Sequence, residues 1–348
     1  MTSPSPSPAS HPPAAAARWR AIDLLRFVAV LLMVQGHAFS ALVSDGVRQA
    51  HWFRYHRYVH GFTAPLFFFA SGLAFMVATW RKWPAHTAWG PVVQQRLGRY
   101  GWLLFIGYML HLPGLRFSPL FGQDAAQAWR AFTQVDALHH IGMTLILAEL
   151  SILVLRRRRW TVSLWAGVGL AAVLAGPWVW RWPAAQHLPL PLAAYANADT
   201  GSLFPLVPWC GFVFAGMLTA RAYQGLEGRL DARAWALPWA TLAFALLLLW
   251  LARRLQLSGV NPFGPHNYWK TSPIFFLTRY AYVLLALGGL SAGEAWLSAR
   301  RTGAPPSWAA RQVQQVGQET LVIYVVHLLV LYGSPVNPGL WRLYRHSL

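Results

Sequence analysis

Long apolar runs recur along the chain, and each is close to the length that a membrane-spanning helix requires. A helix needs about 20 mostly apolar residues to cross the hydrocarbon core of a bilayer. Nine such runs occur, at residues 21–43, 59–80, 98–115, 137–155, 160–179, 203–220, 234–251, 274–298 and 319–333. Their apolar residues are continuous rather than alternating, so the pattern is not that of a transmembrane β-barrel. It predicts an all-α fold, a polytopic membrane helical bundle of about nine to eleven transmembrane helices.

The residues before the first run have a different pattern. Residues 1–17 are mainly Pro, Ser and Ala, with no apolar run and without the basic start of a signal peptide. Such a segment cannot bury enough apolar surface to order itself. We expect a disordered N-terminal tail over residues 1–17 and one transmembrane domain over residues 18–348.

Composition and charge support the membrane assignment. Hydrophobic residues make up 56% of the chain and charged residues 11%, whereas about 25% of the residues of a soluble domain are charged. The net charge of +19 would suggest a nucleic-acid partner for a soluble protein, but here the basic residues lie between apolar runs. We expect the lipid bilayer as a partner and no nucleic acid. The single cysteine, Cys210, excludes a disulfide framework and a cysteine-based metal site, and no metal is predicted.

The residues that flank the runs predict an orientation. Lys and Arg are enriched on the cytoplasmic side of a membrane protein, and more of them lie on the side of the N-terminus, which we therefore expect to be cytoplasmic. Only His11 and His86 of the 13 histidines then fall on the cytoplasmic side. Because ionisable groups within a membrane usually face a cavity, the other histidines predict a polar chamber open to the opposite side.

The first run combines a cation and an imidazole on one face. Arg26 and His37 are eleven residues apart, which puts them on nearly the same side of a helix and roughly 16 Å apart along its axis. Asp23 lies one turn before Arg26, close enough to pair with it and lower the cost of burying the charge. An interfacial ion pair without a function is the alternative.

Three further histidines, His51, His56 and His60, directly precede the second run. A neutral imidazole is a competent general base or nucleophile near physiological pH, so this segment is a second catalytic candidate. His327 lies in the middle of the last run and needs a polar partner, for which Glu319 and Arg279 are available. Two acidic residues in or near runs, Glu149 and Glu294, have no obvious local cation.

Six segments follow one another in an order seen in a known family. An Asp-x-x-Arg start of the first run is followed by HGFTAPLFFFASG, QVDALHHIGMTLIL, SLFPLVPWCGFVFAGML, YWKTSPIFFLTR and GQETLVIYVVHLLVLYGSP. Over roughly residues 18–335 the chain resembles bacterial relatives of heparan-α-glucosaminide N-acetyltransferase, within the transmembrane acyltransferase superfamily. It also resembles the membrane acyltransferases that O-acetylate surface polysaccharides, whose signature is a basic residue, ten residues and then His, as in Arg26 and His37.

The resemblance implies an acyltransferase of the bacterial inner membrane. Such an enzyme moves an acyl group, usually acetyl, from cytoplasmic acyl-CoA to a sugar amine or hydroxyl on the extracytoplasmic side. In the heparan enzyme the catalytic His lies five residues before the Gly of the second motif, where His56 precedes Gly61 here. The position of His37 is Asn in that enzyme and His in the O-acetyltransferases. Both His37 and His56 are therefore catalytic candidates, together with Arg26 and Asp23.

The remaining candidate roles follow from the chemistry of acyl transfer. A base or an acyl carrier is needed, and a buried imidazole can serve as either. Asn267 and Lys270 are candidate donors to the oxyanion in the substrate chamber, which we expect Asp136 and His139 to line as well. A further pair, Arg96 and Arg99, could grip the phosphates of acetyl-CoA, although the positive-inside rule also explains them.

Two other classes of function compete with acyl transfer. A transporter or flippase with the same bundle would carry its substrate without any chemistry. A membrane haem protein would use pairs of intramembrane histidines as axial ligands. The sequence also allows a homo-oligomer, and it does not name the carbohydrate acceptor.

Overall fold

The computed structural model describes residues 20–227, 235–300, 307–333 and 339–344, and within these ranges all regular structure is helical. The tail predicted for residues 1–17 lies outside the described residues. The longer helices are α1 (Arg20–Leu42), α3 (His51–His60), α4 (Thr63–Trp80), α5 (Pro91–Leu110), α7 (Ala137–Leu155), α8 (Arg158–Val179), α11 (Leu206–Glu227), α12 (Ala236–Leu257), α14 (Pro273–Arg300), α15 (Trp308–Gln318) and α16 (Thr320–Tyr332).

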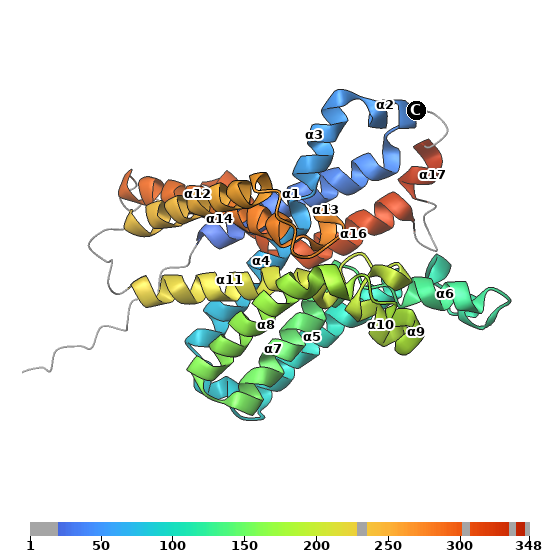
Figure 1. Ribbon diagram of the computed structural model, residues 1–348, viewed down its shortest axis with the longest axis horizontal. Coiled ribbons are helices and arrows are strands. Elements are labelled where there is room, and N and C mark those ends of the chain that lie inside the picture. Colours follow the sequence, from blue (N-terminus) through green and yellow to red (C-terminus); the bar gives the residue numbers. More distant parts are fainter. Residues whose placement is uncertain (1–19, 228–234, 301–306, 334–338, 345–348) are drawn as a thin grey trace, which may run out of the picture.

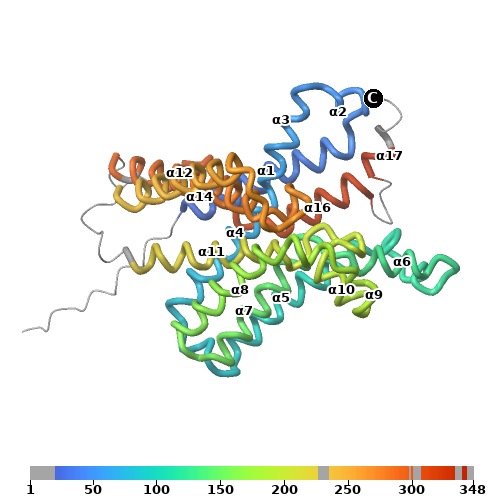
Figure 2. The backbone as a smooth tube through the Cα atoms, in the orientation of Figure 1, coloured from blue at the N-terminus to red at the C-terminus, as the bar shows by residue number. Residues whose placement is uncertain are grey.

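Shorter helices connect these elements. They are α2 (Asp45–Gln49), α6 (Ala125–Phe132), α9 (Ala184–His187), α10 (Leu190–Ala196), α13 (Tyr268–Thr271) and α17 (Leu340–Tyr344), with 3-10 turns η1 (Trp83–His86), η2 (Pro113–Leu115), η3 (Ser118–Phe121) and η4 (Ala198–Thr200). Figure 2 shows α2 and α3 at the top of the view, above α1, which α3 also contacts.

The helices coincide with the predicted apolar runs, which confirms the all-α membrane bundle. Among the described residues, seven helices are long and apolar enough to cross a membrane, or eight if α15 and α16, bent by 76°, form one span. The predicted count of nine to eleven is therefore not confirmed. Helix α5 is long enough but not apolar enough to count as a span, because its first half carries Gln94, Gln95, Arg96 and Arg99.

The closest helix packing in the bundle is between α4 and α11. A Cβ atom added to Gly72 would lie 1.8 Å from the carbonyl oxygen of Val213, and one added to Gly216 would lie 2.0 Å from that of Phe69. No larger residue fits at either glycine, so the two backbones touch directly, as small residues allow in membrane helix pairs. Fully or almost fully buried side chains surround the contact, among them Phe68, Leu73, Phe212 and Met217.

The other long helices are arranged around this pair. Figure 1 shows α12 and α14 on one side of α4, with α5, α7 and α8 on the other. Helix α8 packs against α11, α5 against α7, and α12 against α14, while α1 contacts α4, α14, α15 and α16. Gly36, late in α1, contacts His60 just before α4, and Arg96, early in α5, contacts Thr79 at the end of α4. Helices α1 and α5 therefore both begin at the end of the bundle where α4 ends.

Tertiary packing supplies partners for the two acidic residues that lacked a local cation in the sequence. Glu149 is fully buried, with its Oε1 2.6 Å from His86 Nδ1 and its Oε2 3.5 Å from Arg96 Nη1. The carboxylate of Glu294 accepts hydrogen bonds from the backbone N–H groups of Arg20 and Ala21, at 3.0 and 2.9 Å. It thus satisfies donors in the first turn of α1 that have no partner within the helix.

The glycine contact between α4 and α11 can be tested by adding one methyl group. Gly72→Ala is expected to destabilise the bundle by about 1–3 kcal/mol, because the new Cβ must push the α11 backbone away. Gly289→Ala in α14 is the matched control, since a Cβ there meets nothing within 4 Å. Thermal melting in detergent should show a lower midpoint for the first variant only. Equal midpoints for the two variants would contradict the contact.

Candidate active site

A large cavity runs along α4 between the two sides of the bundle. Its volume is about 1240 Å³, and its walls include Thr63 at the start of α4 and Ala78 near the end. These residues are fifteen positions apart, which corresponds to about 22 Å of helix. On α1, Arg26 and His37 both line the same cavity. The cavity thus extends over most of the thickness that the helices span.

The walls of this cavity are strongly cationic. Among the described residues, seven Lys and Arg side chains line it, against a single carboxylate, that of Asp136. The cations are Arg26, Arg54, Arg57, Arg96, Arg99, Lys270 and Arg279. A cleft lined by one sign of charge raises the local concentration of the opposite sign, so the cavity favours anionic ligands.

His37 of α1 pairs with His327 of α16. The Nδ1 atom of His37 lies 2.7 Å from Nε2 of His327, and the rings are stacked with centroids 5.0 Å apart. His327 Nδ1 lies 2.8 Å from the carbonyl oxygen of Ile323. Glu319 and Arg279, the partners that the sequence suggested for His327, are therefore not those of the structure: His37 of α1 takes that place.

The hydrogen bonds of this pair fix a tautomer when both rings are neutral. A carbonyl oxygen can only accept, so His327 Nδ1 carries a proton and its Nε2 is an acceptor. His37 Nδ1 must then donate to His327, which leaves Nε2 of His37 unprotonated. Among the described residues no hydrogen-bond partner occupies that atom, and His37 borders the cavity. The arrangement presents an imidazole lone pair to a bound ligand.

Two more histidines extend the pair into a row. The His60 ring lies 6.2 Å from that of His37 and 6.1 Å from that of His56. Gly36 makes room for it, because a Cβ at Gly36 would lie 1.8 Å from His60 Nδ1. His60 lines the cavity, whereas His56 packs against Phe39 and Phe53 and accepts a hydrogen bond from Gln35 Nε2 at 2.9 Å.

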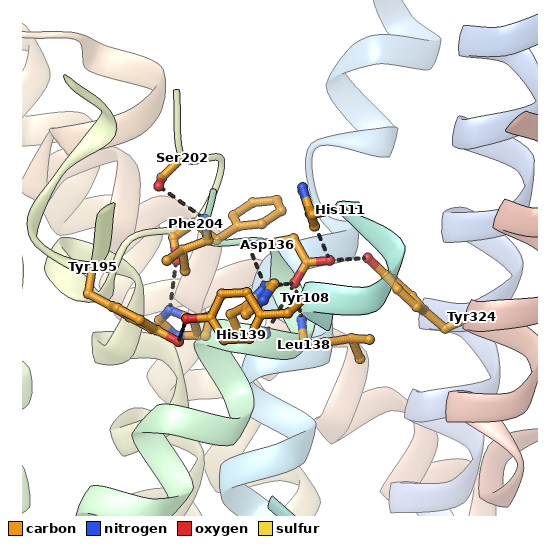
Figure 3. A network of polar contacts seen from close by, with 11 residues as sticks. Tyr108, His111, Asp136, Leu138, His139, Tyr195, Ser202, Phe204 and Tyr324 are labelled. Carbon is orange, nitrogen blue, oxygen red and sulfur yellow. Dashed lines mark hydrogen bonds and ion pairs between the residues drawn. The ribbon is translucent and has the colours of Figure 1, made fainter. Parts of the chain in front are cut away.

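The carboxylate of Asp136 is the centre of a second polar network. Its Oδ1 accepts from the backbone N–H groups of Leu138 and His139 and lies 2.7 Å from His139 Nδ1. Its Oδ2 accepts from the Tyr324 hydroxyl at 3.2 Å and lies 3.5 Å from His111 Nε2. Figure 3 shows the side chains of His111, His139 and Tyr324 turned toward this carboxylate. His139 is fully buried behind Asp136 and is not part of the cavity wall.

This network keeps Asp136 ionised. Burial by itself raises the pKa of Asp136, but hydrogen bonds from His111 and His139 outweigh it and hold the pKa well below its usual range. The possible ligand atoms of His111, Asp136 and His139 all lie within 4.8 Å of one another, a set that a metal ion could use. Hydrogen bonds already engage both carboxylate oxygens. The absence of a metal stays a prediction.

At the end where α1 and α5 begin, cations line the cavity. Arg96 Nη1 donates to Thr79 Oγ1 at 2.5 Å and lies 3.5 Å from buried Glu149, so its guanidinium is held in place from behind. Arg99 is exposed and borders the cavity as well. Arg26 donates to Thr320 Oγ1 at 3.1 Å, whereas buried Asp23 is not in the cavity wall.

Of the two residues predicted as oxyanion donors, only one lines the cavity, at its opposite end. Lys270 of α13 lines the cavity. Asn267 does not, because its side chain accepts from the backbone N–H of Trp269 at 3.1 Å and caps α13. His60, which belongs to the candidate segment before the second run, borders the cavity as well. Sequence reasoning named Arg279 only as a possible partner of His327 and gave Tyr324 no role, yet both residues border the cavity.

The fold and the cavity define a polytopic membrane protein built around a cationic, histidine-containing chamber. The model of the family described as heparan-alpha-glucosaminide N-acetyltransferase, catalytic, matches residues 18–255. This range is more than half of the chain, so the chain belongs to that family and is a membrane protein of acyltransferase type. The matched range ends before YWKTSPIFFLTR and the last motif of the resemblance. No curated protein matches the chain at a significant level.

The pH dependence of stability tests the Asp136 network. Because the pKa of Asp136 is lower when folded than the usual value of about 3.9, its ionised form contributes stability that is complete above that pH and is lost as pH falls. Asp136→Asn keeps an N-cap but loses the charge. Its free energy of unfolding at pH 7 should therefore be about 1–3 kcal/mol below that of wild type, seen as a lower melting temperature. That difference should shrink toward pH 3.

Exposed Asp124 offers a matched control for this measurement, because it precedes α6 without a side-chain capping bond. Asp124→Asn should leave the melting curve unchanged at each pH. An Asp136→Asn variant as stable as wild type at pH 7 would contradict the network.

Proposed function

We propose that the protein transfers an acetyl group from cytoplasmic acetyl-CoA to a sugar amine or hydroxyl on the extracytoplasmic side of a bacterial inner membrane. The observation that carries the proposal is the continuous cationic cavity, which reaches from Arg96 to His37. An N-terminus in the cytoplasm puts Arg96 at the cytoplasmic mouth and His37 near the far end. One cavity can then take up the donor from one side and the acceptor from the other.

The cytoplasmic mouth suits the donor. Coenzyme A carries several phosphate charges, and guanidinium groups bind phosphate oxygens in a bidentate manner. Arg96, Arg99 and Arg26 border this part of the cavity. Glu149 and Thr79 hold Arg96 from the protein side, which lowers the cost of ordering the guanidinium when a phosphate arrives.

His37 is the proposed catalytic base. Acyl transfer from a thioester needs a group that removes the acceptor proton or that holds the acyl group itself. The Nε2 lone pair of His37 serves either route, because the bond to His327 directs it away from the partner and toward the ligand. In direct transfer, Nε2 takes the proton as the amine or hydroxyl attacks the thioester carbonyl, and the thiolate of coenzyme A leaves.

The row of imidazoles gives the proton of His37 a way out. Ring centroids follow one another at 6.2 and 6.1 Å from His37 through His60 to His56. His60 borders the cavity and His56 is bound to Gln35 outside its wall. These contacts support His37 as the base and give His56 a supporting role, although the family resemblance alone favours His56.

Steady-state kinetics with purified protein test these assignments. With acetyl-CoA as donor and glucosamine as acceptor, His37→Ala should lower kcat by about 10²–10⁴ and leave the KM for acetyl-CoA close to wild type. His327→Phe removes the acceptor for His37 Nδ1–H and should also lower kcat. His327→Gln retains an acceptor and should recover most of the loss. His56→Ala should keep turnover within about tenfold of wild type.

Each outcome of this experiment has a distinct meaning. If His56→Ala abolishes turnover while His37→Ala does not, the roles of the two histidines are reversed. A folded wild-type protein that neither binds acetyl-CoA nor releases thiol from it would contradict acyl transfer. The transporter becomes the leading candidate in that case, since a continuous cavity serves a carrier equally well.

The donor end has its own test. Arg96→Gln should raise the KM for acetyl-CoA about tenfold or more, because it removes a charged hydrogen-bond donor to phosphate, while kcat changes little. Arg116→Gln provides the control, since Arg116 lies outside the cavity wall. An unchanged KM in the Arg96 variant would place the phosphates elsewhere.

A further inference from the structure

Arg279 is a buried cation inside a membrane-spanning helix. Only 2% of it is exposed, and it lies in the first third of α14. Three aromatic rings surround its guanidinium, with the carbon atom 3.9 Å from the ring centre of Phe62, 4.4 Å from Tyr58 and 5.0 Å from Phe275. Its Nη1 donates one hydrogen bond to the Tyr58 carbonyl at 3.2 Å.

Within the described part of the chain, no carboxylate lies within 4.0 Å of the Arg279 guanidinium, so the charge has no acidic partner there. A guanidinium has five N–H donors, and a single backbone carbonyl accepts from Arg279. A charge buried without a counter-ion is costly, and within membrane segments such residues mark substrate or ion pathways. The aromatic rings stabilise the cation but leave most of its donors for a ligand.

A second cavity lies against Arg279. Its volume is about 710 Å³, and it adjoins the large cavity, because Tyr58, Trp269, Phe275 and Arg279 line both. Its other walls come from α12, α13 and α14, including Arg253, Gln256, Tyr268 and Tyr282. Two guanidinium groups therefore line one cavity whose other polar side chains, among the described residues, are those of Gln256, Thr278, the tyrosines and Trp269, none of them charged.

We propose that this second cavity binds a phosphate ester, with Arg279 and Arg253 as the anion-binding groups. Two guanidinium groups match the charge of a phosphate ester better than that of a single carboxylate, and their fork geometry suits phosphate oxygens. Trp269, Tyr268 and Tyr282 offer aromatic faces to a sugar ring or an interfacial headgroup. That the bound molecule is the acyl acceptor rests on the proposed function.

The phosphate can belong to a free sugar phosphate or to a lipid headgroup. Helix α12, which forms one wall, exposes apolar side chains such as Leu246, Leu247 and Trp250 to the surroundings of the bundle. Arg253 and Gln256 are exposed near the end of that helix. A lipid headgroup could therefore enter from the side of the bundle, and a sugar phosphate from the aqueous end.

Binding measured in the absence of acyl-CoA tests the site. Purified full-length protein in a neutral detergent is titrated with glucosamine 6-phosphate, glucosamine, dihexanoyl phosphatidic acid and dihexanoyl phosphatidylcholine, using calorimetry and the shift in melting temperature. The two phosphate monoesters are glucosamine 6-phosphate and dihexanoyl phosphatidic acid, and their counterparts are glucosamine and dihexanoyl phosphatidylcholine. We expect at least one monoester to bind and to raise the melting temperature, and its counterpart to bind at least tenfold more weakly. Which of the two monoesters binds more tightly identifies the source of the phosphate.

Variants connect the binding to the two arginines. Arg279→Gln should weaken binding of the monoester at least tenfold, Arg279→Lys less, and Arg253→Gln several-fold. Arg254→Gln is the matched control, because Arg254 is the next residue of α12, lies over the Trp250 ring and is not in the cavity wall. It should bind as wild type does.

Two results would overturn the proposal: equal affinity for each monoester and its counterpart, or unchanged affinity in both Arg279→Gln and Arg253→Gln. Failure of acetyl transfer would leave the binding result standing, because no acyl donor is present in the titration. Conversely, loss of phosphate binding would leave the roles of His37 and Arg96 unaffected.

Discussion

The contact between the backbones of α4 and α11 is the constraint on which the rest of the structure depends. Without side chains at Gly72 and Gly216, the two helices approach until carbonyl oxygens fill the space of a Cβ. Dispersion and shape, rather than exclusion of water, hold membrane helices together, so such close contacts have a large effect on which helices pair. Helix α4 is thereby fixed along its length, and the opposite face of α4 forms a wall of the large cavity.

The molecule also has an excess of positive charge, and in the part of the chain that the structure describes only some of its buried cations have an acidic partner. Near α5, Glu149 and His86 form a buried pair that also holds Arg96. In the middle, Asp136 is surrounded by donors from α7 and α16 and by His111. At the far end, Arg279 has aromatic rings in place of a carboxylate. An anionic substrate that binds in the cavity can supply the negative charge that such a cation lacks.

Sequence reasoning located the helices well and some of their ends less well. The run predicted at 98–115 is the helix α5 over Pro91–Leu110. The helix begins earlier than predicted because its polar first turns, in which Val93 is buried and Arg96 donates to Thr79, are helical without being apolar. The shared face of Arg26 and His37 followed from helical spacing, and both border one cavity. The partner of His327 could not be found in this way, because it lies 290 positions away along the chain.

The sequence by itself determined that the chain is a helical membrane protein of this acyltransferase family, because apolar run length and local motifs are properties of short stretches. Tertiary structure alone decided which histidines meet, which arginines border the cavity, and that His56 and His139 lie outside its wall while His37 and Asp136 form it. The reason is geometric. Helical periodicity fixes the face on which a side chain lies, but the neighbour of that face depends on how helices distant in the chain pack together.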